Sequence, residues 1–187
     1  MKKVFKVFSI CLMLVLVLAG CSKKSPTDKV LIAGADSNFS DYLLDAEKVG
    51  IQYTPTFVFY KDGKLQFFND GESDVQSFTE LYNNAQKSKE ELAKIYGVTA
   101  EDAIKYSNQG NSIYTEKLTD LNGNTFKLSD FEGLVCIEVV QTACSHCVTQ
   151  LTEYSDDIYA AFPDITFIVY FIDADAAQVQ SFLDTLK

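Results

Sequence analysis

The chain has 187 residues and is acidic, with 26 Asp and Glu residues against 16 Lys and Arg and a formal net charge of −10. This balance argues against a nucleic-acid partner, because such partners require a basic surface. An apolar content of 47% excludes an intrinsically disordered chain, and the length fits one domain or two small ones.

The first twenty residues have the composition of a targeting segment. Three lysines among the first six residues precede an uncharged, mostly apolar run over residues 7–20, which is too short for a comfortable transmembrane helix. We therefore predict a signal peptide at residues 1–20 and a polar tether at residues 21–29.

The tetrapeptide Leu18-Ala19-Gly20-Cys21 resembles the lipobox of bacterial lipoproteins. In that family the cysteine becomes the new N-terminus and carries lipid, so the resemblance implies a lipid anchor on Cys21. The protein would then sit on the bacterial cell membrane and face away from the cytoplasm, where disulfides can persist. The alternatives are an ordinary signal peptide or an anchor helix.

Residues 30–86 are predicted to form a first folded segment. Its expected elements are a strand at 30–33, a helix at 39–49, a hairpin of strands at 57–60 and 64–68 around Asp62-Gly63, and a helix at 73–86.

Residues 87–114 are predicted to form a helical connector without chemistry of its own. Leu92, Ile95 and Tyr96 suggest one helical face, and a second short helix is expected at 99–106.

Residues 115–187 are predicted to form a second folded segment. Its expected elements are a hairpin at 118–128, a helical turn at 129–133, a buried strand at 134–140, a helix after Cys147, a strand at 165–172 and a helix at 176–186. In the helix after Cys147, apolar residues recur every three or four positions, at 148, 151, 154, 158 and 162, and predict its buried face.

The motif Cys144-Ser145-His146-Cys147 lies where the buried strand gives way to this helix. A helix N-terminus lowers the pKa of a thiol, so Cys144 is expected to attack a disulfide and Cys147 to resolve the mixed disulfide. His146 is the only histidine of the chain, and beside Cys144 it would favour the thiolate. The alternative for His146 is an exposed residue without a role.

Both folded segments resemble parts of a thioredoxin. The order Asp-x-x-Gly from Asp120, hairpin, Leu-Ser-Asp-Phe-x-Gly from Leu128, strand and Cys-x-x-Cys resembles the opening of membrane-anchored thioredoxins that act on extracytoplasmic thiols. Thr54-Pro55, followed by a hairpin and a helix, resembles the second half. The resemblance implies an α/β, thioredoxin-like fold with a central mixed sheet flanked by helices. It also implies a cis Pro55, with Thr54 beside it pairing with substrate. The alternative is a trans proline that opens an edge strand.

The resemblance also gives Glu138 a role. Thioredoxins carry a buried Asp, and protein disulfide isomerase a Glu, six residues before the first cysteine, where the acid passes protons to the second cysteine. Glu138 has this spacing within a core strand, where an unpaired carboxylate is costly. The alternative is a strand end turned toward water. Cys136 is expected to be a small core residue.

The chain departs from the family in two ways. Ala143 stands where the family has Trp, and no Pro lies between the cysteines, which argues against strong disulfide-reductase activity. The half with Pro55 also precedes the half with Cys-x-x-Cys. A shift of 139 residues aligns six residues of the two segments, including Val30 with Val169, as in two units in tandem.

Two arrangements follow from this order. In the first, the halves dock as one circularly permuted fold with Pro55 against Cys144, which covers sheet edges that each half alone would expose. In the second, the chain is truncated or its halves pair between molecules.

The predicted function is that of a lipid-anchored, extracytoplasmic thiol–disulfide oxidoreductase. Its expected partners are thiols or disulfides of exported proteins and a membrane redox partner, and no cofactor is implied. The alternatives are a redox-inactive interaction lipoprotein and a metal-binding thioredoxin relative that uses Cys144, His146 and Cys147. The metal-binding families normally need a distant His, which this chain lacks, so no metal site is predicted.

Overall fold

The computed structural model describes residues 30–34, 53–62, 64–97 and 117–187. The predicted signal peptide, the tether and Cys21 lie outside these residues, as do the helices expected at 39–49 and 99–106.

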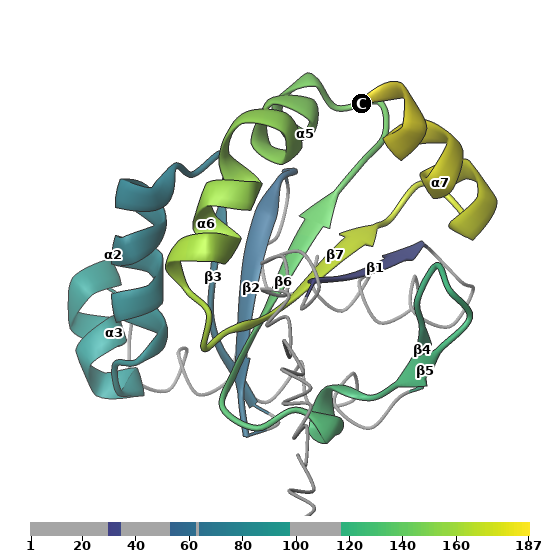
Figure 1. Ribbon diagram of the computed structural model, residues 1–187. Coiled ribbons are helices and arrows are strands. Elements are labelled where there is room, and N and C mark those ends of the chain that lie inside the picture. The colour runs from purple at the N-terminus through teal and green to yellow at the C-terminus, as the bar shows by residue number, and fades with distance from the viewer. Residues whose placement is uncertain (1–29, 35–52, 63, 98–116) are drawn as a thin grey trace, which may run out of the picture.

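The centre of the molecule is a five-stranded mixed sheet in the order β1-β7-β6-β2-β3 (Figure 1). The strands are β1 (Val30–Gly34), β2 (Thr56–Lys61), β3 (Lys64–Asp70), β6 (Leu134–Val140) and β7 (Thr166–Phe171). β1, β7 and β6 run parallel to one another, whereas β2 is antiparallel to both β6 and β3. The predicted strands and the expected α/β class with a mixed sheet flanked by helices are confirmed.

The pairing of β2 with β6 joins the two predicted segments. It runs in continuous antiparallel register from Thr56 opposite Val139 to Lys61 opposite Leu134. Residues 30–86 and 115–187 therefore contribute strands to one sheet within one chain.

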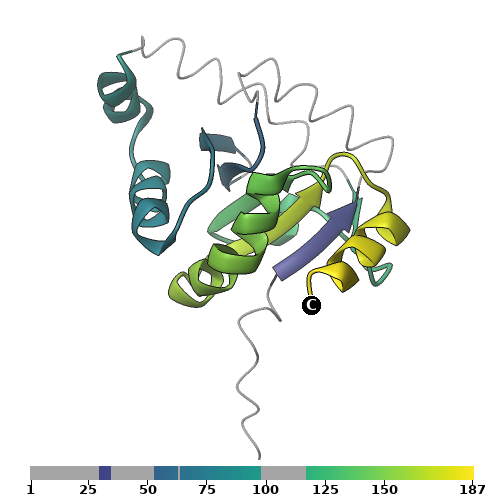
Figure 2. The same ribbon diagram turned by 90° about the horizontal axis from the view of Figure 1, so that it is seen from above.

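The remaining elements surround this sheet. They are α2 (Val75–Ala85), α3 (Lys89–Tyr96), the small hairpin of β4 (Leu118–Thr119) and β5 (Thr125–Phe126), a 3₁₀ turn (Leu128–Asp130), α5 (Ser145–Thr149), a π-helical turn (Gln150–Tyr154), α6 (Ser155–Ala161) and α7 (Ala176–Thr185). Viewed from above, α5 and α6 form one helical run along a face of the sheet (Figure 2).

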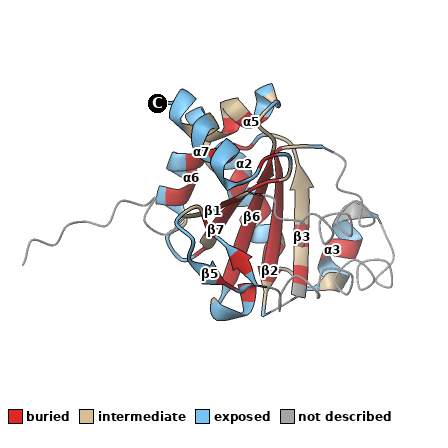
Figure 3. Cartoon of the chain, turned by 90° about the vertical axis from the view of Figure 1, so that its right-hand side faces the viewer, coloured by how far each residue is buried: buried red, intermediate tan, exposed pale blue. Residues whose placement is uncertain are grey.

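Each face of the sheet packs into a hydrophobic core, and the three central strands β2, β6 and β7 are buried while the outer helix surfaces are exposed (Figure 3). On one face, residues such as Phe57 and Phe167 pack against α2, α6 and α7. On the other face, Leu118, Phe126 and Leu128 of the hairpin and the 3₁₀ turn cover β6 and β2.

The predicted face of α3 differs from the observed one, whereas the predicted face after Cys147 packs on the core and is joined there by two polar residues. In α3, Leu92 and Ala93 are buried, whereas Ile95 is 51% exposed. After Cys147 the spacing is interrupted by the π turn, in which the Ser155 N–H donates to the Gln150 carbonyl five residues earlier. Gln150 and Ser155 are buried in this run, while Leu151 and Tyr154 are partly buried against the core.

The helix α3 also covers the outer strand of the sheet. The half-buried amine of Lys89 donates to the carbonyl oxygens of Leu65 (2.7 Å) and Gln66 (2.9 Å) on β3. Burial lowers the pKa of Lys89 to about 8.

No helix among the described residues is long and apolar enough to cross a membrane.

Phe78 is the centre of the larger core. It is fully buried in α2, and its ring lies 5.2 Å from that of Phe57 and 5.0 Å from that of Phe162, measured between centroids. We expect Phe78→Ala to lower the free energy of unfolding by about 3–5 kcal/mol, because it leaves a cavity between helix and sheet. Urea denaturation measures this change. Gln76→Ala, on the exposed side of the same helix, is the control and should change stability by less than about 0.5 kcal/mol. A similar loss in both variants would contradict this packing.

Candidate redox site

Cys144 occupies the N-cap position of α5, directly after the sheet. Its backbone is extended, and its sulfur accepts a hydrogen bond from the Cys147 N–H at 3.1 Å. The Cys144 side chain is partly exposed, whereas Cys147 is fully buried in the larger core. All three described cysteines are free thiols.

The loop before β2 reaches the first thiol. The Thr54–Pro55 peptide bond is cis, as predicted, and the Cys144 thiol donates to the Thr54 carbonyl at 3.3 Å. The Thr54 hydroxyl donates to the Gln141 side chain at 2.9 Å. The predicted contact between the proline loop and the Cys-x-x-Cys motif is therefore present within one chain.

The two thiols differ in their readiness to ionise. Burial opposes ionisation of Cys144, but hydrogen bonds to its sulfur, chiefly from Cys147 and also from the His146 backbone, outweigh it and lower the pKa of this thiol. Burial, together with the hydrogen bond to Cys144, raises the pKa of Cys147 to about 12. The Cys144 thiol therefore ionises more readily than the Cys147 thiol.

His146 lies on the surface and contacts a residue that the sequence analysis did not consider. Its Nδ1 pairs with a carboxylate oxygen of Glu72, from the loop between β3 and α2, and the side chains of His146 and Glu72 are 75% and 28% exposed. The N–H of Gly71 in the same loop donates to the Pro55 carbonyl at 2.8 Å. This loop therefore touches both the proline segment and the motif.

Glu138 is fully buried on β6, and the alternative of a strand end turned toward water is wrong. Its two carboxylate oxygens accept hydrogen bonds from Ser155 (2.9 Å) and Tyr159 (2.5 Å). Burial raises its pKa to about 7, although both hydrogen bonds oppose the shift. Cys136, two residues earlier, is fully buried in the same core, and burial raises its pKa well above the usual thiol value.

Sequence reasoning missed the buried polar residues around Glu138. Gln150 and Ser155 are polar residues among the apolar positions of the helix after Cys147, and a polar side chain there gives no sequence signal of burial. Tyr159 precedes the end of α6 beside the predicted core position Ile158, where an aromatic residue is typical of ordinary packing. Glu72 offers no sequence signal.

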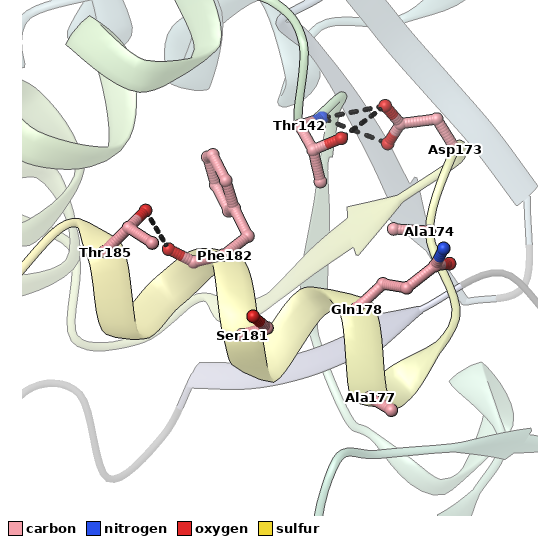
Figure 4. Close-up of a pocket in the computed structure, with 8 residues that line it drawn as sticks. All are labelled: Thr142, Asp173, Ala174, Ala177, Gln178, Ser181, Phe182 and Thr185. Atoms are coloured by element: carbon pink, nitrogen blue, oxygen red, sulfur yellow. Dashed lines mark hydrogen bonds between the residues drawn. The ribbon is translucent and has the colours of Figure 1, made fainter.

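A cavity of about 500 Å³ lies beside the segment that leads to Cys144 (Figure 4). It is bounded by Thr142 and by residues of α7 such as Phe182. The N–H and hydroxyl of Thr142 donate to the Asp173 carboxylate at 2.8–3.0 Å, and this contact holds the end of β6 to the start of α7.

Among the described residues, no group of three or more His, Cys, Asp or Glu side chains is arranged to hold a metal ion.

Comparisons of the chain with protein-family models, with curated proteins and with solved structures found no match.

We expect iodoacetamide to modify Cys144 before Cys147 and Cys136 in the folded, reduced protein. Because only the thiolate reacts, the rate of modification should be half-maximal at a pH below the pKa of an unperturbed thiol. Mass spectrometry of peptides across a pH series locates the adduct. Cys147 and Cys136, both buried, serve as internal controls. Modification of Cys147 at the same rate as Cys144 would refute the assignment of the nucleophile.

Glu138 should make stability depend on pH. Its pKa is about 7 in the folded protein against 4.5 when unperturbed, so the folded state binds the proton more tightly. The contribution of Glu138 to the free energy of unfolding is full below about pH 4.5. It falls by about 3 kcal/mol as the pH rises to about 7. We expect Glu138→Gln to remove this part of the slope in urea denaturation at pH 5 and pH 8. Glu153→Gln, an exposed acid of the π turn, should keep the slope, and an unchanged slope in Glu138→Gln would contradict the assignment.

Proposed function

We propose that this protein is a thiol–disulfide oxidoreductase with a thioredoxin-like fold whose two halves are in permuted order. The observation that carries the proposal is the position of the Cys144 thiol, between the Cys147 N–H and the Thr54 carbonyl beside cis Pro55. A helix-capping thiol of lowered pKa, one helical turn from a buried thiol of raised pKa, is the arrangement that thiol–disulfide exchange requires.

The permuted fold is supported by the sheet. From β6 onward, the chain gives a strand, the Cys-x-x-Cys motif, a helix, a strand and a helix, and from Pro55 onward it gives a hairpin and a helix. These are the two halves of a thioredoxin in reversed order. The antiparallel pairing of β2 with β6 brings them into one sheet, as a permuted arrangement needs.

The proposed reaction proceeds in two exchanges. The Cys144 thiolate attacks a substrate disulfide, so that a bond forms between Cys144 and one substrate sulfur while the other leaves as a thiolate and takes a proton. Cys147 then gives its proton to Glu138 and attacks the Cys144 sulfur, which releases the second substrate sulfur. Two electrons have passed from the protein to the substrate, and the reverse sequence oxidises a substrate dithiol.

The surface around the thiols suits an extended protein substrate. Tyr53, next to Thr54, has 69% of its surface exposed, and the cis-proline loop lies directly against Cys144. We propose that the substrates are exported proteins, that a membrane redox partner resets the thiols, and that lipid on Cys21 holds the protein at the outer face of the membrane. The last proposal rests on the sequence of residues 1–21 alone.

The test is a redox equilibrium of the full chain, kept soluble in detergent, against a series of glutathione buffers, with acid trapping of the thiols. We expect one two-electron transition between roughly −120 and −270 mV, the range of catalytic pairs. The transition should be lost in Cys144→Ser and in Cys147→Ser, and kept in Cys136→Ala. Thiols that stay reduced throughout, or a disulfide that resists reduction far below this range, would refute the proposal and favour a redox-inactive interaction protein.

A further inference from the structure

A buried chain of hydrogen bonds links the loop between β3 and α2 to Glu138. Gln150 is fully buried, its Oε1 accepts from the Ser73 N–H at 2.7 Å, and its Nε2 donates to the Ser73 carbonyl at 3.1 Å. The same Nε2 donates to the Ser155 hydroxyl at 3.3 Å, and that hydroxyl donates to Glu138. Tyr159 donates to the second carboxylate oxygen.

The direction of each hydrogen bond in this chain is fixed by its first member. A backbone N–H can only donate and a carbonyl can only accept, so the peptide groups of Ser73 determine which end of the Gln150 amide is nitrogen. The second hydrogen of that nitrogen points at the Ser155 oxygen. Ser155 has one hydroxyl hydrogen, and it must then point at Glu138.

The π turn makes this chain possible. Gln150 and Ser155 are five residues apart and stand on the same side of the helix because the Ser155 N–H bonds to the Gln150 carbonyl. In an uninterrupted α-helix they would be turned away from each other, and Glu138 would lose one of its two donors.

We propose that Gln150 and Ser155 are positioning residues that, with Tyr159, hold Glu138 at the end of a one-directional hydrogen-bond chain anchored on the peptide groups of Ser73. The use of this chain in disulfide exchange rests on the function proposed above, in which Glu138 takes the proton of Cys147. Its existence does not depend on that function.

The chain has a definite electrostatic consequence. Two donors aimed at the carboxylate favour its ionised form and oppose the effect of burial. Tyr159 remains a donor, because burial and the nearby Glu138 raise its own pKa well above the usual range. Glu138 is therefore able to lose and regain a proton near neutral pH. An acid that exchanges protons with a buried thiol needs this property.

The test is the titration of the Glu138 carboxyl in the full, reduced chain in detergent, followed by ¹³C NMR of glutamate-labelled protein, with Glu138→Gln to assign the signal. We expect a midpoint near pH 7 in the unaltered protein. Tyr159→Phe and Ser155→Ala each remove one donor and should raise the midpoint by about one to two pH units.

Gln150→Met decides whether the effect travels along the chain. The Gln150 side chain hydrogen-bonds to Ser73 and Ser155 and reaches Glu138 through the Ser155 hydroxyl. Its replacement should nevertheless raise the midpoint, and this increase should vanish in a Ser155→Ala background and persist in a Tyr159→Phe background. Thr152→Ala, which removes an exposed hydroxyl from the same π turn, should leave the midpoint unchanged.

Three outcomes would overturn the inference: an unchanged midpoint in Ser155→Ala, an unchanged midpoint in Gln150→Met, or an equal Gln150→Met effect with and without Ser155. Should Gln150→Met fail to fold, the midpoint in Ser155→Ala, which loses one hydroxyl only, still decides. Because the titration needs no substrate, it separates this inference from the proposed function: shifted midpoints in a protein without a redox transition would refute the function alone.

Discussion

The antiparallel pairing of β2 with β6 is the constraint on which the candidate site depends. It joins two segments that lie far apart in the sequence and sets the register in which Thr56, two residues after Thr54, stands opposite Val139, five residues before Cys144. Because a slip by one residue would turn every side chain of a strand to the other face, the buried faces of both strands fix this register. The contact between the Cys144 thiol and the Thr54 carbonyl follows from it.

The strand β6 also determines how deeply the acid and the thiols of the candidate site are buried. Glu138 and Cys136 lie on its face toward α2 and α6, in the core that also holds Cys147, while Cys144 stands past the strand end where water reaches it. One short segment thus offers a partly exposed thiol of lowered pKa, a buried thiol of raised pKa and a buried acid that titrates near neutrality. Burial raises the pKa values of Glu138 and Cys147, whereas hydrogen bonds lower that of Cys144.

The strands and most of the candidate site residues could be predicted from the sequence. The π turn and the contacts of Gln150, Ser155 and Glu72 could not, for physical reasons. The apolar runs at 134–140 and 165–172 and the Asp62-Gly63 turn indicated the strands, because buried strands and tight turns have strong local signals. The thiols were found through their motif, and Thr54, Pro55 and Glu138 through the resemblance of the sequence to thioredoxins. The π turn was not, since it depends on tertiary packing rather than on local propensity, and with it Gln150 and Ser155 were missed. Glu72 reaches His146 from a loop 74 positions away, a contact that no local pattern encodes.

The amine of Lys89 shows that the connector has a task of its own. The outer strand of an open sheet displays backbone groups to which a strand of another molecule can add, and natural proteins often guard such strands with a charge. Lys89 occupies the carbonyls of Leu65 and Gln66 on β3 and places a half-buried cation there. At this end of β3, the addition of a further strand would have to displace the Lys89 amine from both carbonyls. The consequence of this contact is that α3 guards an edge of the sheet as well as packing on the core.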